Sequence, residues 1–187
     1  MLGLFLLLPV LALHARELPD YTPVLLGLAM GAYGLTQALL QIPFGRWSDR
    51  FGRKPVIAVG LALFAAGSLI GVVAQSVAML IVARSVQGAG AVSAAVSALL
   101  ADLTRPEVRT RAMAVVGASI GLSFVLALVL APVLDAVIGV PGIFVLMLVM
   151  ALSGLLLLGL AVPAEPVRSG GADSRSLVAL LELLRRP

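Results

Sequence analysis

The feature that most constrains the fold is a charged stretch between two long apolar runs. Residues 45–54 (GRWSDRFGRK) separate an apolar run that begins at residue 23 from another that begins at residue 55. A helix needs about 20 apolar residues to cross the hydrocarbon of a bilayer, and both runs are long enough. A charged, non-helical connection is not stable in hydrocarbon. The stretch is therefore predicted to form a tight loop at a membrane surface.

Composition extends this prediction to the whole chain. Of its 187 residues, 61% are hydrophobic and 12% are charged, and the mean hydropathy is +1.14. A soluble domain needs more polar surface than this. We expect an all-α membrane protein with roughly six transmembrane helices, arranged as two inverted three-helix repeats. The predicted spans are residues 1–13, 23–47, 55–74, 77–101, 112–134 and 141–162.

The two ends of the chain differ from its middle. Residues 1–13 are apolar, but at about 1.5 Å per residue they reach only ~20 Å into a core of roughly 30 Å. We expect them to be the outer half of a first helix whose beginning is missing. Residues 1–163 are predicted to form the six-helix domain, and residues 164–187 a cytoplasmic linker. Apolar side chains at 177, 180, 181 and 184 predict an amphipathic helix over residues 174–186 of this linker.

The basic residues predict the orientation of the chain. All 13 Lys and Arg residues except Arg16 and Arg84 fall within residues 45–54, residues 102–111 or the tail after residue 163. Such a bias is typical of the cytoplasmic side of a membrane protein. An even number of spans then places both termini in the cytoplasm, with the protein in the inner (plasma) membrane. The charges are expected to face a lipid bilayer, and no nucleic acid is expected as a partner.

The sequence offers little for enzyme chemistry. It has no cysteine, a single histidine (His14) and no glycine-rich loop of the kind that cradles phosphates. These features argue against hydrolase, metal-site and ATPase functions. We expect no catalytic residues, no metal and no cofactor.

Polar residues within the predicted spans mark a candidate pathway. Arg84 lies seven residues into the span 77–101, about 10 Å from its outer end, where a charge costs several kcal/mol unless it faces a partner or a wet cavity. It is expected either to face a partner or a wet cavity inside the bundle or to extend outward to the lipid headgroups. Tyr33, Gln37 and Gln41 recur every four residues and form one stripe on their helix. This stripe is predicted to line a pathway or to face another half of the protein, or else to form hydrogen bonds between helices.

Pairs of glycines four residues apart occur in three of the spans. The pairs are Gly27 with Gly31, Gly67 with Gly71, and Gly117 with Gly121. Small residues at this spacing let helix backbones approach closely. All three pairs are therefore predicted to lie at helix contacts.

The charges in residues 45–54 oppose the dipoles of their own helices. Asp49 follows the carboxyl end of one span, which is negative, while Arg53 and Lys54 precede the next span at its positive amino end. Charges in these positions need other partners. Asp49 is expected to pair with Arg53 or Arg50, and Asp102 is expected to lie close enough to join. The alternative is that the bases only anchor the chain at the membrane surface.

These residues resemble the signatures of the major facilitator superfamily. The signature between the second and third helices has a glycine, an acid four residues later, then a base, a glycine and two bases. The matching residues are Gly45, Asp49, Arg50, Gly52, Arg53 and Lys54, with Trp47 where an aliphatic residue is usual. A second signature resembles RSVQGAG, with Arg84, Gln87, Gly88 and Gly90, and a third resembles ADLTRPEVRTRA, which contains Asp102.

The resemblance implies the amino-terminal half of a twelve-helix secondary transporter that works by alternating access. It implies that residues 45–54 and Asp102 form a cytoplasmic gate and that the second signature lines the pathway. The expected partners are a small-molecule substrate, the bilayer, and a carboxy-terminal six-helix half or a second copy. The expected activity is proton-coupled efflux of small amphipathic molecules or drugs, although Pro132 alone matches the antiporter pattern of the fifth span. The alternatives are a sugar or organic-acid facilitator or symporter, and a transport-incompetent fragment or membrane interaction module.

Overall fold

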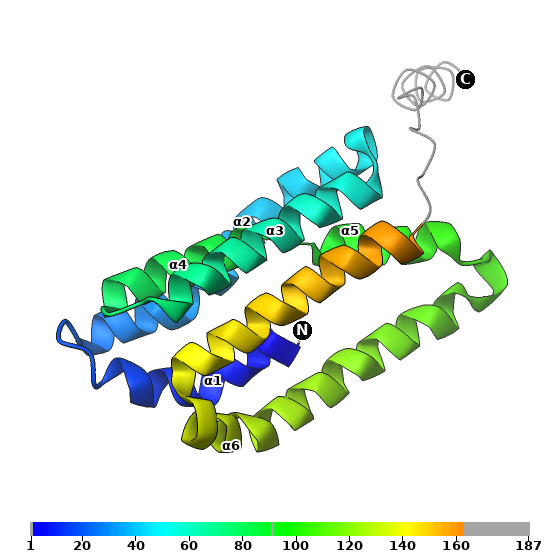
Figure 1. Ribbon diagram of the computed structural model, residues 1–187. Coiled ribbons are helices and arrows are strands. Elements are labelled where there is room, and N and C mark those ends of the chain that lie inside the picture. Colours follow the sequence, from blue (N-terminus) through cyan, green and yellow to red (C-terminus); the bar gives the residue numbers. More distant parts are fainter. Residues whose placement is uncertain (1, 91, 163–187) are drawn as a thin grey trace, which may run out of the picture.

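The computed structural model describes residues 2–90 and 92–162, shown as a ribbon in Figure 1. All regular structure within these residues is helical, which confirms the predicted all-α class. The helices are α1 (Leu2–Ala15), α2 (Pro23–Phe51), α3 (Arg53–Val72), α4 (Val77–Ala89), α5 (Ser93–Leu103) and α6 (Pro106–Ala161). The predicted linker and its amphipathic helix lie outside the described residues.

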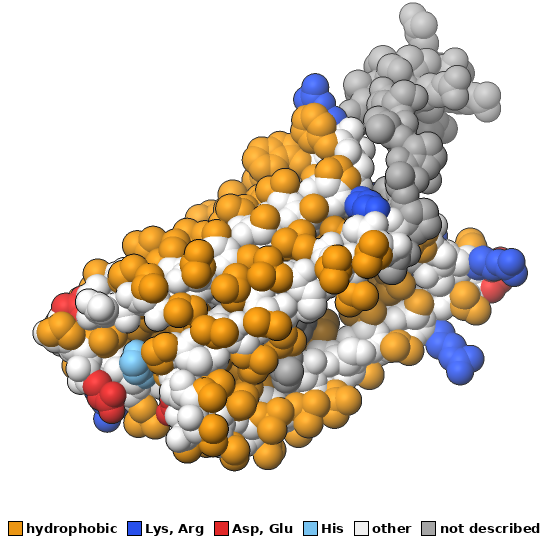
Figure 2. All heavy atoms as spheres, in the orientation of Figure 1, with side chains coloured by type: hydrophobic (Ala, Val, Ile, Leu, Met, Phe, Trp, Pro, Cys, Tyr) orange, Lys and Arg blue, Asp and Glu red, His pale blue; other side chains and the backbone are white. Residues whose placement is uncertain are grey.

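Four helical stretches of the described chain are long and apolar enough to cross a membrane. They are Pro23–Phe51, Arg53–Val72, Val77–Leu103 and Pro106–Leu160. Helix α1 has only 14 residues, in agreement with the short first apolar run. Large apolar side chains point outward, with Val24 73% and Leu160 78% exposed. Figure 2 shows hydrophobic atoms over most of the visible face and charged side chains near its two ends, the arrangement that a hydrocarbon surrounding favours.

The predicted loop over residues 45–54 is wrong, because most of this stretch is helical. Helix α2 continues to Phe51 and α3 begins at Arg53, so that Gly52 alone joins them. Gly52 has φ 95° and ψ 154°, a conformation almost restricted to glycine. A helix satisfies its own backbone hydrogen bonds up to the membrane surface. The charges therefore lie on two helix ends and not on an irregular loop.

The predicted span 77–101 is interrupted. Helix α4 ends at Ala89 and α5 begins at Ser93. The interruption lies against α3, since a Cβ placed on Gly90 would overlap the carbonyl oxygen of Gly60, and a Cβ on Gly60 would overlap the side chain of Val92. The apolar residues on both sides gave no sequence signal for this break.

The last two predicted spans belong to a long helix that turns back on itself. Helix α6 begins at Pro106, so the predicted charged loop 102–111 shrinks to a short connection after α5. The predicted loop over residues 135–140 is also mostly helical. Its backbone departs from helical geometry at Gly139, with φ 66° and ψ 174°, and the chain reverses there. In Figure 1 the arms over residues 106–138 and 140–161 form two sides of a V.

The largest buried cluster surrounds α1, which lies between the two arms of α6 (Figure 1). It brings together side chains of α1, α4 and both arms: Leu6, Leu7, Val10, Leu11, Leu80, Ala127, Ala131, Val140, Ile143, Phe144 and Met147. Further apolar clusters form around Phe44, at the end of the bundle that carries Arg53, and around Val77 at the opposite end. The buried core thus extends along the whole bundle.

The prediction for the glycine pairs is correct for one pair only. A Cβ on Gly67 would lie 2.6 Å from the Gln87 amide nitrogen, and one on Gly71 would overlap the ring of Phe144. The pairs on α2 and on the first arm of α6 meet nothing within 4 Å among the described residues. Spacing along one helix does not reveal which face a second helix covers.

Candidate functional site

An ion cluster centred on Arg53 occupies the charged end of the bundle. The Nη1 atom of Arg53 donates to the hydroxyl oxygen of Ser48 at 3.0 Å and pairs with the carboxylate of Asp49. Its Nε donates to Oδ2 of Asp102 at 3.1 Å. Ser48 and Asp49 are on α2 and Asp102 is on α5, so one guanidinium joins three helices. The predicted pairing of Asp49 with Arg53, joined by Asp102, is confirmed.

Lys54 finds its partner at the far end of the chain. Its ammonium donates to the carbonyl oxygens of Gly159 at 3.3 Å and Val162 at 2.5 Å. These carbonyls belong to the end of α6, where the helix dipole is negative and orphan acceptors need donors. A charge that is unfavourable for α3 is therefore favourable for α6.

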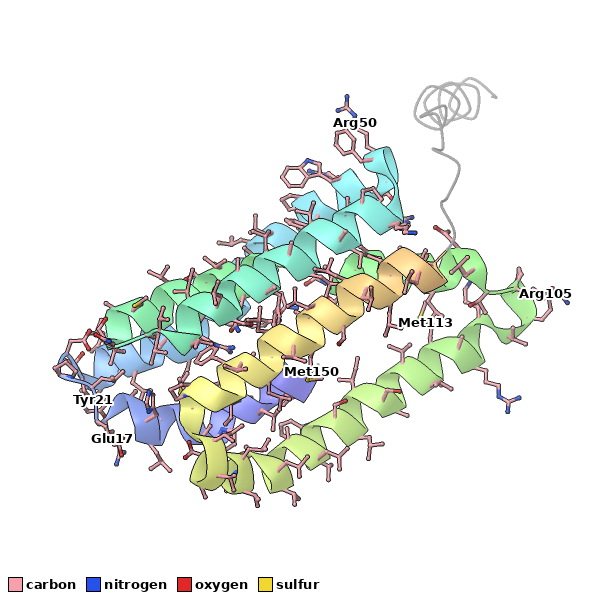
Figure 3. All side chains as sticks on the ribbon, in the orientation of Figure 1. Glu17, Tyr21, Arg50, Arg105, Met113 and Met150 are labelled. Carbon is pink, nitrogen blue, oxygen red and sulfur yellow. The ribbon has the colours of Figure 1, made fainter. Side chains whose placement is uncertain are left out.

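The remaining residues of the first signature have separate places. Arg50 is exposed and stacks over the ring of Phe51 at 5.5 Å, and Figure 3 shows it pointing away from the bundle. It does not pair with Asp49, which is bound to Arg53. A Cβ on Gly45 would meet no described residue within 4 Å, whereas Gly52 is required by its backbone conformation. The structure thus gives a geometric reason for one of the two glycines.

A second polar cluster is buried between α2, α3 and α4 around Arg84. Arg84 is 1% exposed, and its Nη1 donates to Oε1 of Gln87 at 3.0 Å. The Gln87 amide donates to the Ser68 hydroxyl at 2.9 Å, and Ser68 donates to the Phe64 carbonyl oxygen at 2.8 Å. The guanidinium carbon lies 4.7 Å from the ring centroid of Tyr33. Arg84 is therefore turned into the bundle and not outward to the headgroups.

Gly88 and Gly90 bring α4 close to its neighbours. A Cβ on Gly88 would overlap the Tyr33 carbonyl oxygen and the Thr36 hydroxyl on α2, and Gly90 faces the backbone of α3. These contacts hold the helix that carries Arg84 against the helix that carries Tyr33. The second signature therefore combines two polar side chains with two glycines that allow them to be buried.

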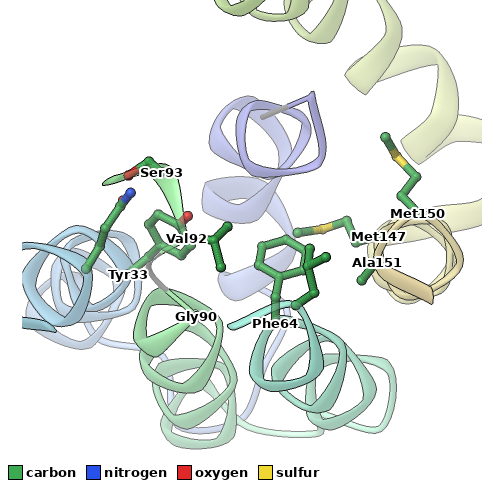
Figure 4. Close-up of a pocket in the computed structure, with 10 residues that line it drawn as sticks. Tyr33, Phe64, Gly90, Val92, Ser93, Met147, Met150 and Ala151 are labelled. Carbon is green, nitrogen blue, oxygen red and sulfur yellow. The ribbon is translucent and has the colours of Figure 1, made fainter. Parts of the chain in front are cut away.

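A cavity of about 190 Å³ adjoins this cluster (Figure 4). Tyr33 and Gln37 of the predicted stripe line it, while Gln41 is exposed and does not. The other lining residues come from α3, from the α4–α5 junction and α5, and from the second arm of α6: Leu61, Phe64, Gly90, Val92, Ser93, Met147, Met150 and Ala151. The cavity is mainly apolar with a few neutral polar groups.

Several residues of these clusters were not singled out from the sequence. Ser48 and Ser68 are 1% and 0% exposed and bind Arg53 and Gln87 respectively. A serine within an apolar run is common, so its type and position carry no functional signal. Ser48 lies within the first signature stretch, and its place beside Asp49 was the available clue.

Asp20 was also missed, and it holds the opposite end of the bundle. Its carboxylate accepts hydrogen bonds from the backbone N–H groups of Val77 at 2.7 Å and Ala78 at 3.0 Å, at the start of α4. These bonds lower the pKa of Asp20 below its ordinary value of 3.8. An anion at a helix amino terminus is favoured by the dipole and by the free N–H groups. The loop after α1 is thereby tied to α4.

Comparisons with known proteins place the chain among membrane transporters. The Major Facilitator Superfamily profile matches residues 1–187. The chain is 53% identical over 95 residues to the inner membrane transport protein YajR of Escherichia coli, covering 51% of this chain and 21% of that protein. It is 46% identical over 61 residues to multidrug resistance protein D of E. coli, covering 33% of this chain and 16% of the relative.

A more distant relative is multidrug resistance protein 1 of Bacillus subtilis, 32% identical over 90 residues, covering 48% of this chain and 23% of that protein. The matched segments thus span less than a quarter of each of these three relatives. The family consists of transporters, which is consistent with the lack of enzyme chemistry in the sequence. With its profile matched over every residue, the chain belongs to the major facilitator superfamily.

Proposed function

We propose that the chain is the amino-terminal half of a secondary active transporter that exports small amphipathic molecules in exchange for protons. Its six spans would be α1, α2, α3, the α4–α5 pair and the two arms of α6, related as inverted three-helix repeats. Residues 1–163 would form this domain, and residues 164–187 a cytoplasmic linker. The other wall of the transport path would come from a second six-helix half or a second copy.

Two relatives support export as the direction of transport. The names of the E. coli and B. subtilis proteins describe multidrug resistance. The mostly apolar cavity suits a compound with an apolar part. The name of YajR places that relative in the inner membrane, and we propose the same location here, with both termini cytoplasmic.

The observation that carries the mechanism is the Arg53 cluster. It joins α2, α3 and α5 through one exposed carboxylate and one partly exposed carboxylate, so its bonds can break at modest cost. Interactions of this strength suit a gate, which must form in one state of a transporter and open in the other. We propose that the cluster, with Gly45, Arg50, Gly52 and Lys54 around it, keeps the cytoplasmic side closed in the outward-facing state.

Replacement of Asp49 by Asn in the complete transporter tests this role. The change removes the charge that pairs with Arg53 and keeps the shape of the side chain. Exposed ion pairs contribute up to about 1 kcal/mol, so the population of one state should change by up to about fivefold and turnover should fall by a similar factor. Substrate affinity should stay within about twofold, because the cluster lies away from the cavity.

The assay is export of ethidium, a cation, and of benzoate, an anion, from proteoliposomes with and without a pH gradient, together with the binding of each compound. Glu107→Gln is the matched control, since Glu107 is an exposed acid that follows α5 and takes no part in the cluster. Unchanged turnover in Asp49→Asn would refute the gate. Substrate counterflow at a rate independent of the pH gradient would refute proton coupling and indicate facilitated diffusion.

A further inference from the structure

Arg84 is a buried cation without a counter-charge among the described residues. No described carboxylate lies within 4.0 Å of its guanidinium. Asp49 and Asp102 are bound to Arg53, and Asp20 is bound to the start of α4. A buried guanidinium is costly unless an opposite charge or several good hydrogen bonds compensate for its lost hydration.

The partners that Arg84 does have are neutral. Gln87 accepts one hydrogen bond from Nη1, and the ring of Tyr33 offers its electron-rich face. The Nε–H group of Arg84 has no hydrogen-bond partner among the described residues. Buried polar groups are nearly always paired, so an orphan N–H on a buried cation indicates a missing acceptor. A carboxylate is the acceptor whose charge and geometry best match a guanidinium.

A space that can hold an apolar body adjoins Tyr33, although Arg84 itself is not part of its lining. Tyr33 belongs to both places, because its ring stacks on Arg84 and also lines the cavity. Phe64 and Met147 supply apolar walls, and Gln37 is a neutral polar group. The described lining contains no acidic side chain that would attract a cation.

We infer that this half binds amphipathic monoanions, with the carboxylate at Arg84 and the apolar body in the cavity. This inference rests on the proposed transport function and names its substrate class. At about 190 Å³ the cavity is smaller than the ~300–1,000 Å³ of a typical ligand site. It therefore accommodates an apolar part about the size of one aromatic ring, with further contacts from the second half. Cations of the same shape are disfavoured, because their charge would face the guanidinium.

Binding of three ring compounds to the complete transporter in detergent tests the inference. Benzoate, benzyl alcohol and benzylamine share a benzene ring and one further carbon, and differ in charge. The expected order of affinity is benzoate, then benzyl alcohol, then benzylamine. Loss of one charge-assisted pair corresponds to about 10- to 100-fold in affinity, so benzoate should exceed benzyl alcohol by this factor. Equal or tighter binding of benzylamine overturns the inference.

Two variants separate the charge from the cavity. Arg84→Met should reduce the affinity for benzoate by about 10- to 100-fold and leave benzyl alcohol within twofold. Ala151→Leu should weaken both compounds, because the larger side chain fills the cavity. Arg46→Met is the control for loss of one positive charge, since Arg46 is exposed and lies outside the cavity. Full benzoate affinity in Arg84→Met overturns the inference.

The outcomes also distinguish this inference from the proposed function. Arg84→Lys, which keeps the charge and loses the planar fork, should bind benzoate with intermediate affinity and replaces Arg84→Met if that variant does not fold. If neither variant folds, the order of the three compounds on the unmodified protein decides. Ethidium export without preference for benzoate overturns the anion site and leaves the transporter standing. Arg84-dependent benzoate binding without transport of any compound supports the anion site and refutes the proposed transport function.

Discussion

Gly88 allows the sharpest test of the packing that holds the buried cluster together. A Cβ at this position would overlap the carbonyl oxygen of Tyr33 and the hydroxyl of Thr36, and would lie 2.9 Å from the Tyr33 Cα. Two of these three atoms are backbone, so α2 and α4 must separate when Gly88 becomes alanine. Gly117 on α6 is the matched control, because a Cβ there would meet nothing within 4 Å in the described part of the chain.

The expected effects have opposite signs. Opening the Gly88 contact to ordinary van der Waals distance moves the helices apart by roughly 1 Å, which sacrifices much of their dispersion contact. Overpacking of this kind costs up to about 3 kcal/mol, and the better helix propensity of alanine returns about 1 kcal/mol. Gly88→Ala should therefore lose about 2 kcal/mol, while Gly117→Ala should gain up to about 1 kcal/mol.

Thermal unfolding followed by circular dichroism in detergent measures both changes. For a chain of this length, 1 kcal/mol corresponds to roughly 2–4 °C in Tm, so Gly88→Ala should melt about 4–8 °C lower. Gly117→Ala should melt at or slightly above the unmodified protein. All proteins are heated at the same scan rate, because membrane proteins often unfold irreversibly. A Tm for Gly88→Ala that equals or exceeds that of Gly117→Ala would refute the close contact between α2 and α4.

Two further predictions concern the ends of the bundle. Hydrogen bonds from Val77 and then Ala78 lower the pKa of Asp20, so its stabilisation is present above the ordinary value of 3.8 and is lost as the pH falls through the lowered value. Asp20→Asn should therefore have a lower Tm than the unmodified protein at about pH 7, and the difference in Tm should shrink below about pH 4. A difference in Tm that grows in acid would contradict this prediction. Gly52→Ala should lose about 1–3 kcal/mol, because its backbone conformation is almost restricted to glycine. Gly45 lies within a helix and a Cβ there meets no described residue, so Gly45→Ala should be neutral or slightly stabilising. Equal Tm values for the two variants would contradict the conclusion that only Gly52 is required by its backbone conformation.

The ion cluster shows how far charge patterns can be read from a sequence. The positions of Asp49, Arg53 and Lys54 against their own helix dipoles correctly indicated that these charges need partners elsewhere. For Asp49 the choice between Arg50 and Arg53 stayed open, because both are near in sequence. Packing of α5 against α2 and α3 placed Asp102 next to Arg53 and left Arg50 outside. The partner of Lys54, more than 100 residues away, had no sequence signal.

The helix breaks show a different limit. Hydropathy indicated the lengths of the apolar segments, but it predicted loops over residues 45–54 and 135–140. The chain stays helical there up to Gly52 and Gly139 respectively. A single glycine can reverse the chain, so a connection needs few polar residues. The break near Gly90 arises at the close approach to Gly60, a contact between segments about 30 residues apart in sequence.

The sequence by itself determined the membrane environment, the helical class and the ends at which charges gather. These follow from the length of apolar runs and from the cost of placing charge in hydrocarbon, which are properties of each segment alone. The tertiary structure decided that Arg84 is buried with only neutral described partners, that Gly67 and Gly71 are packed while the other two pairs are open, and that Tyr33 links Arg84 to a cavity. These features depend on which helix faces meet, and helix faces meet through contacts between segments that are distant along the chain.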